Sequence, residues 1–157
     1  MKRTLLLALA VLCGAVGCGT KTIPNTRVED TKANREVIDF VEKYRKAVEQ
    51  RDAAALLRLT SIDYFDDMGT PAGDDDVDYG ALQAGLKRVR EEVLGARYQI
   101  SYRGVTYTET RKVLVDLLYT GWFKVSTPDG EQWRRRLQAH RIVLAREDHG
   151  LKIISGM

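Results

Sequence analysis

The chain has 157 residues, 44% hydrophobic and 30% charged, which is enough for about one domain with a single apolar core. Its formal net charge is +3 from 25 basic and 22 acidic residues. Two of those basic residues, Lys2 and Arg3, lie in a segment predicted below to be removed, which leaves 23 against 22. A charge so nearly balanced argues against a nucleic-acid partner.

The N-terminus has the features of a signal peptide. Lys2 and Arg3 precede an almost uninterrupted small and apolar run from Thr4 to Val16. As a helix this run would span about 20 Å, too short for a bilayer core of about 30 Å. Residues 1–17 are therefore predicted to be a signal peptide that is cleaved off.

The run ends in Ala15-Val16-Gly17-Cys18, which resembles the lipobox of bacterial lipoproteins. The resemblance implies a lipid, palmitate included, on Cys18 and an exported protein anchored to a membrane through it. Gly19 follows the cysteine with no Asp, which by the same resemblance implies the periplasmic face of the outer membrane in a host with two membranes. An ordinary secretory signal with an incidental cysteine is the alternative.

Cysteine chemistry is not expected in the mature chain. The second cysteine, Cys13, would leave with the signal peptide, so neither disulfides nor cysteine metal sites are expected after cleavage.

The segment that follows the signal peptide is predicted to be a linker. Residues 18–33 are polar and aperiodic around Pro24 and are predicted to be the lipidated cysteine followed by a flexible tether. The globular domain is expected over residues 34–157.

Three helices are predicted first in that domain. Residues 34–50 carry one apolar stripe, formed by Val37, Val41, Tyr44 and Val48. Two further helices are expected over residues 53–60 and 79–94. Their predicted N-caps are Asp52 and Asp78, and Gly95 is expected to end the third helix. Leu86, in the middle of the third stripe, is expected to be buried against a sheet.

After Gly95 the hydrophobic period changes from helix to strand. Tyr98, Ile100 and Tyr102 alternate with polar residues, and residues 113–125 form a more apolar, central strand. The turn sequence at residues 127–130 predicts a hairpin into a strand over residues 133–146, and a last strand covers residues 151–154. Helices followed by hairpin-linked strands predict an α+β fold with three N-terminal helices on an antiparallel sheet of four or more strands.

The order of elements, the stretch from Tyr44 to Leu59 and the ending Gly150-Leu151-Lys152-Ile153-Ile154 resemble the nuclear transport factor 2-like superfamily. This superfamily includes ketosteroid isomerases and polyketide cyclases. The resemblance implies a cone-like domain, in which a curved sheet wraps around the helices and a pocket opens between them.

The resemblance does not extend to the isomerase catalytic set. Tyr44 matches the tyrosine of the first helix by its spacing to Asp52. The position of the catalytic base falls on Met68, one residue from Asp67, and that of the sheet acid falls on Ile142. This sequence therefore has the required residue at one of the three catalytic positions of a ketosteroid isomerase.

Candidate site residues follow from these placements. The catalytic candidates are a carboxylate at the pocket rim together with a tyrosine and a histidine, namely Asp63 or Asp67, Tyr44 and His140. Aromatic and polar side chains expected to line a pocket are Tyr44, Tyr102, Tyr119, Trp122 and His140. Core filling, or a dimer face on the sheet, would use the same aromatic residues. No spacing of ligands indicates a metal, and no motif indicates a cofactor.

Two hypotheses for function remain. The first is a lipid-anchored module that binds a small apolar ligand or a protein, with a homodimer through the sheet as one form of the latter, and performs no catalysis. The second is a small hydrolase or isomerase that uses a pocket carboxylate with Tyr44 and His140. Whether these side chains converge on one cavity distinguishes the two.

Overall fold

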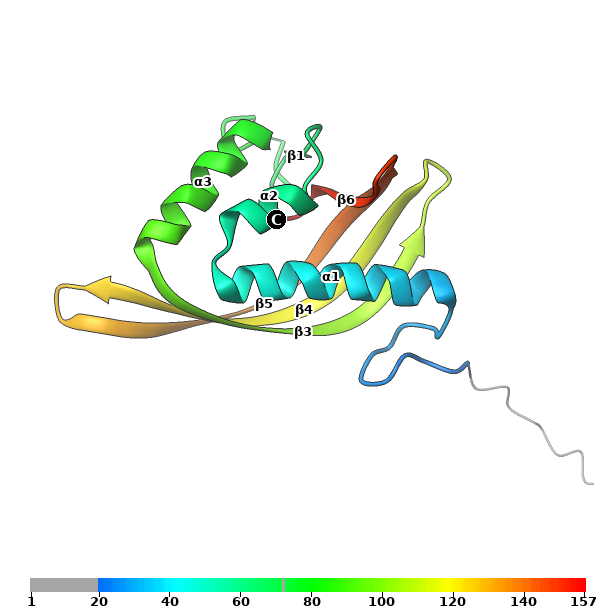
Figure 1. Ribbon diagram of the computed structural model, residues 1–157, viewed down its shortest axis with the longest axis horizontal. Helices are drawn as coiled ribbons and strands as arrows, with labels where there is room; N and C mark the ends of the chain where they lie inside the picture. Colours follow the sequence, from blue (N-terminus) through cyan, green and yellow to red (C-terminus); the bar gives the residue numbers. More distant parts are fainter. Residues whose placement is uncertain (1–19, 72) are drawn as a thin grey trace, which may run out of the picture.

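The computed structural model describes residues 20–71 and 73–157 and has the predicted α+β architecture (Figure 1). Four strands form an antiparallel sheet in the order β3-β4-β5-β6, and β1 pairs with β2 in a separate short ribbon. The elements are α1 (Lys32–Gln50), α2 (Ala53–Leu59), β1 (Phe65–Asp66), β2 (Val77–Asp78), α3 (Tyr79–Glu92), β3 (Val93–Tyr107), β4 (Lys112–Thr127), β5 (Gly130–Glu147) and β6 (Gly150–Ser155). The long strands bend, and the helices lie on the inner side of the bend (Figure 1).

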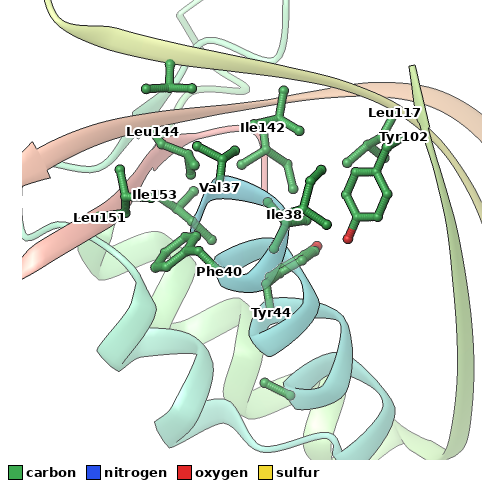
Figure 2. Close-up of a cluster of buried hydrophobic side chains, with 14 of the residues drawn as sticks. Val37, Ile38, Phe40, Tyr44, Tyr102, Leu117, Ile142, Leu144, Leu151 and Ile153 are labelled. Atoms are coloured by element: carbon green, nitrogen blue, oxygen red, sulfur yellow. The ribbon is translucent and has the colours of Figure 1, made fainter. Parts of the chain in front are cut away.

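Helix α1 packs along the sheet through the predicted stripe. Val37 and Val41 are 1% and 0% exposed, and Tyr44 is 6% exposed. The helix begins two residues before the predicted start, because the Thr31 hydroxyl accepts a hydrogen bond from the backbone N–H of Asn34 at 3.1 Å. Figure 2 shows the side chains of α1 pointing into the apolar layer formed by the sheet.

The segment before α1 is not a free tether. Thr22 forms an isolated bridge with Glu29, and the backbone N–H of Arg27 donates to the Tyr102 carbonyl of β3 at 3.2 Å. Val28 inserts into the core and is 2% exposed. The folded domain therefore begins near Thr22 rather than at residue 34, because Val28 enters the core and Ile23 packs against it. The predicted signal peptide and Cys18 lie outside the described residues.

The caps of α2 and α3 are as predicted. The Asp52 carboxylate accepts from the N–H of Ala55 at 2.9 Å, and that of Asp78 accepts from Ala81 at 2.7 Å. The chain passes straight from α3 into β3 at Val93, so Gly95 lies inside a strand rather than ending a helix.

The expected burial of Leu86 is wrong. Leu82, one turn earlier in α3, is 7% exposed, but Leu86 is only partly buried and Val89 is 46% exposed. This half of α3 lies over a cavity, described below, instead of packing tightly on the sheet.

The inner face of the sheet supplies the other half of the core. Strand β4 lies between β3 and β5, as its apolar sequence predicted, and its odd-numbered residues from Val113 to Tyr119 are buried. Ile142 and Leu144 of β5 and Ile153 of β6 are completely buried beside them. Figure 2 shows these side chains facing α1.

The hairpin of β4 and β5 extends beyond the helices (Figure 1). Strand β6 pairs only with Val143–Glu147, so Gly130–Ala139 has a neighbour in β4 alone and is exposed throughout. Within residues 20–71 and 73–157, no helix combines the length and apolar character needed to cross a membrane.

Candidate functional site

An apolar cavity of about 100 Å³ lies where the end of α1, both following helices and the inner face of the sheet meet. Its walls are mainly aliphatic and aromatic carbon, with two arginines and one phenol. The lining residues are Tyr44, Val48, Arg51, Ala53, Leu56, Leu86, Val89, Arg90, Val93, Ala96, Phe123 and Met157.

Among the described residues, Tyr44 is the one predicted site residue that lines this cavity. Its ring meets the ring of Tyr98 edge-on, with centroids 6.2 Å apart. Burial raises the pKa of Tyr44 to about 12, although the Tyr98 hydroxyl counteracts this by hydrogen bonding. Tyr44 is therefore neutral at physiological pH and can donate or accept a hydrogen bond at the cavity wall.

Two arginines border the cavity. Arg51 ends α1 in the left-handed conformation, with φ of 52°, and its guanidinium donates to the Val93 carbonyl at 2.5 Å. Arg90 comes from the last turn of α3 and is exposed. A polar groove of about 470 Å³, lined by Gln50, Arg51, Asp52 and Arg90, adjoins the cavity through these two arginines.

His140 does not reach the cavity. Its Nε2 is 2.9 Å from the Gly156 carbonyl oxygen, and its ring packs edge-on against Tyr119 with centroids 5.9 Å apart. Tyr119 in turn stacks on Tyr98 at 5.0 Å, and Tyr98 contacts Tyr44. Two rings therefore stand between Tyr44 and His140, and the space that a substrate would need between them is filled with side chains.

The carboxylate candidates also lie elsewhere. Asp63 and Asp67 are exposed, and one Asp67 oxygen accepts the N–H of Gly69 at 3.0 Å, which is a turn interaction. The carboxylate with contacts inside the fold is Asp66, whose Oδ2 accepts from the Tyr64 hydroxyl at 3.2 Å and from the Gly156 N–H at 2.7 Å. Its partner Gly156 lies 90 residues later, so no local pattern could have selected Asp66 from its neighbours.

The remaining aromatic candidates are divided between the two faces of the sheet. Tyr102 donates to the Glu42 carboxylate at 2.7 Å, and Tyr119 donates to Gln138 at 3.1 Å, both on the inner face but outside the cavity lining. Trp122 has the opposite parity in β4. It lies on the outer face, where the guanidinium of Arg135 is 6.0 Å from its ring.

Several lining residues were not identified from the sequence as site residues. Phe123 follows Trp122 and points inward, as alternation along β4 would have indicated. Met157 reaches the cavity because its backbone N–H donates to the Tyr64 hydroxyl at 3.1 Å and its sulfur accepts from Thr60 at 3.4 Å. That placement depends on long-range contacts.

The arrangement favours binding over proton transfer. Among the described residues, the cavity lining holds Tyr44, Arg51 and Arg90 as its titratable groups, and no carboxylate or imidazole is among them. No three His, Cys, Asp or Glu side chains of residues 20–71 and 73–157 gather into a set that could hold a metal ion. The cavity can accept an apolar group, and its edge can donate hydrogen bonds.

Comparison with known proteins identifies the fold. No protein-family model and no curated protein matches the chain. A ketosteroid isomerase-like protein from Erwinia carotovora is similar in structure, with a TM-score of 0.64 at 16% identity over 81% of this chain and 95% of that one. A protein provisionally assigned as a dehydratase of the NTF2-like family, from Streptomyces avermitilis, gives 0.62 at 15% identity over 78% and 92%.

A domain from Xanthomonas campestris, provisionally assigned as a calcium/calmodulin-dependent protein kinase II association domain, gives 0.63 at 16% identity over 87% and 90%. At these identities the likeness concerns the fold. The domain has the nuclear transport factor 2-like fold that its sequence resembles.

Proposed function

We propose that this protein is a ligand-binding module of the cell envelope, which holds a small apolar molecule in the cavity between its helices and sheet and performs no catalysis on it. The observation that carries this proposal is the apolar lining contributed jointly by α1, α2, α3, β3 and β4. Concave, apolar sites with a few polar groups are the usual form of small-molecule sites. The cone-like arrangement expected from the resemblance would provide such a pocket.

The size of the cavity limits the ligand. Its volume of about 100 Å³ is below the ~150 Å³ of an engineered cavity that admits benzene, and well below the ~300–1,000 Å³ of drug-sized sites. A single ring or a short alkyl chain fits after small side-chain shifts. A fused-ring steroid does not.

The absence of catalysis is proposed on the positions of the candidates. A hydrolase or isomerase would need a carboxylate or imidazole beside Tyr44 at one reacting atom. Asp63 and Asp67 are exposed, and His140 is bonded to the Gly156 carbonyl two rings away. The raised pKa of Tyr44 also makes it a poor acid at neutral pH.

The site in the cell is proposed from the N-terminal sequence. Cleavage after Gly17 and a lipid on Cys18 would anchor the domain, on the periplasmic face of an outer membrane if the host has one. Because the fold begins near Thr22, four residues would span at most about 14 Å and hold the domain close to the membrane. Cys18→Ala should abolish labelling with palmitate and release the protein from the membrane fraction, and labelling that persists would contradict the assignment.

A calorimetric titration tests the ligand site. Toluene, a neutral apolar molecule with a single ring, should bind the mature chain carrying Cys18→Ala with a measurable heat. Ala96→Phe should abolish this binding, because residue 96 lies on the inner face and lines the cavity. Leu94→Phe adds the same ring two residues away at a position 40% exposed and outside the lining, and should leave binding unchanged. Equal binding by both variants would place the bound toluene outside this cavity.

A homodimer through the outer sheet face is a second candidate, because large apolar side chains are exposed there. Trp133 and Leu137 are 48% and 55% exposed on the same side of β5. Leu137→Glu should then convert a dimer to a monomer in sedimentation experiments. Ile62→Glu, at a position 72% exposed outside the sheet, serves as the control. If the protein without these substitutions is already a monomer, this interface is refuted.

A further inference from the structure

We infer that the ligand of this cavity is an amphipathic anion, with a short alkyl or aryl body in the apolar part and an anionic headgroup held between Arg51 and Arg90. This inference rests on the proposed function and specifies the chemical class of the ligand. Its basis is the junction of two hollows, an apolar cavity and a polar groove, at the same two arginines.

The two hollows differ sharply in character. The cavity is walled by side chains such as Leu56, Phe123 and Met157, whereas the groove is formed by Gln50, Arg51, Asp52 and Arg90. A purely apolar ligand would use only the first. A molecule with an apolar end and a polar end would use both, and its polar end would lie at the arginines.

The charge at the junction is positive. Among the described residues, neither Arg51 nor Arg90 takes part in an ion pair, although six other cations do: Lys21, Arg35, Arg45, Lys124, Arg141 and Arg146. The one acid of the groove, Asp52, already accepts the N–H of Ala55 to cap α2. Two guanidinium groups against one engaged carboxylate leave an excess of positive charge, which favours an anion.

The two arginines differ in how firmly they are placed. Arg51 is partly buried and fixed by its bond to the Val93 carbonyl, which occupies one amino group and leaves others of its five N–H donors free. The Arg90 side chain is exposed and makes no ion pair or hydrogen bond with a described residue. It can therefore change rotamer to contact a bound headgroup. A fixed donor and a mobile one suit capture of a ligand that enters from solvent.

Matched ligands with the same chain test the charge. Octanoate, octyl phosphate and neutral 1-octanol should compete with toluene for the mature chain carrying Cys18→Ala. At least one anion should compete roughly tenfold better than octanol, the effect of about one hydrogen bond to a charged group. The better of the two anions distinguishes a carboxylate from a phosphate headgroup.

Variants of the two arginines locate the effect. Arg90→Gln should reduce the preference for the anion over octanol severalfold, and Arg51→Gln with Arg90→Gln should abolish it. Arg51→Lys keeps the positive charge and should retain part of the preference for the anion. It replaces Arg51→Gln in the test if that substitution disturbs the fold. The control is Arg88→Gln, on the same helix but outside both hollows.

The outcomes separate this inference from the proposed function. Equal competition by octanol and both anions, or a preference for the anion that survives the double variant, would overturn the inference while leaving an apolar ligand site. No binding of toluene or of any octyl compound would instead refute the proposed function itself.

Discussion

The Asp66 carboxylate accepts the backbone N–H of Gly156 at 2.7 Å and so joins the short β1 strand to the end of the chain after β6. The same carboxylate oxygen accepts a hydrogen bond from the Tyr64 hydroxyl. That hydroxyl in turn accepts a hydrogen bond from the backbone N–H of Met157 at 3.1 Å. These bonds hold Met157 where its side chain lines the cavity. The far wall of the cavity therefore depends on one carboxylate that lies outside it.

Replacement of Asp66 should weaken both the fold and the site. Asp66→Ala leaves the Gly156 N–H without its acceptor and should lower the free energy of unfolding by about 1–3 kcal/mol. Urea unfolding measures this. Asp63→Ala, an exposed carboxylate three residues earlier, is the control and should change stability by less than about 0.5 kcal/mol. Equal effects of the two substitutions would show that the Asp66 bonds contribute nothing.

Gly156 should not tolerate a side chain. Its φ is +84°, and a Cβ there would lie 2.1 Å from the backbone carbonyl oxygen of Arg141. Gly156→Ala should therefore destabilise the protein by about 1–3 kcal/mol or more, because backbone rather than a flexible side chain must move. Gly85→Ala, in the middle of α3 with open space around it, should stabilise by about 0.5–1 kcal/mol. Thermal unfolding of the two variants should thus shift in opposite directions.

Stability should fall steeply at alkaline pH. Burial raises the pKa of Tyr44 to about 12, and raises the pKa of Tyr64, Tyr98 and Tyr102 further. Between the ordinary value of about 10 and these values, the unfolded chain loses protons that the folded chain keeps. The free energy of unfolding should therefore be insensitive to tyrosine ionisation below about pH 10 and decrease from there to about pH 12. A urea midpoint that stays constant over this interval would contradict the burial of these phenols.

The sequence predicted the elements because each leaves a local signal. The stripe of Val37, Val41 and Tyr44, the cap at Asp52 and the alternation from Tyr98 to Tyr102 all depend on near neighbours, and all are confirmed. Docking of the segment around Val28 was not predictable, since two apolar residues, Ile23 and Val28, in a polar stretch make no helix or strand period.

The site was harder to predict for the same reason. Tyr44 was identified by its spacing to Asp52, which matches the tyrosine of the family that the sequence resembles, and it lines the cavity. His140 has the inward parity that the sequence indicated, but the row of Tyr98 and Tyr119 that separates it from Tyr44 arises from strand register. Arg51 and Arg90 line the same cavity and groove although they come from different elements, which no spacing in the sequence reveals.

Native mass spectrometry of the mature protein carrying Cys18→Ala, purified from its own host without detergent, tests the central claim most directly. A fraction of the protein should carry an additional small mass, and the Ala96→Phe variant should lose it because the added ring occupies the cavity. The Leu94→Phe control should retain it. A protein that shows only its own mass in every preparation, or an adduct kept equally by Ala96→Phe, would contradict the account of this cavity as a ligand site.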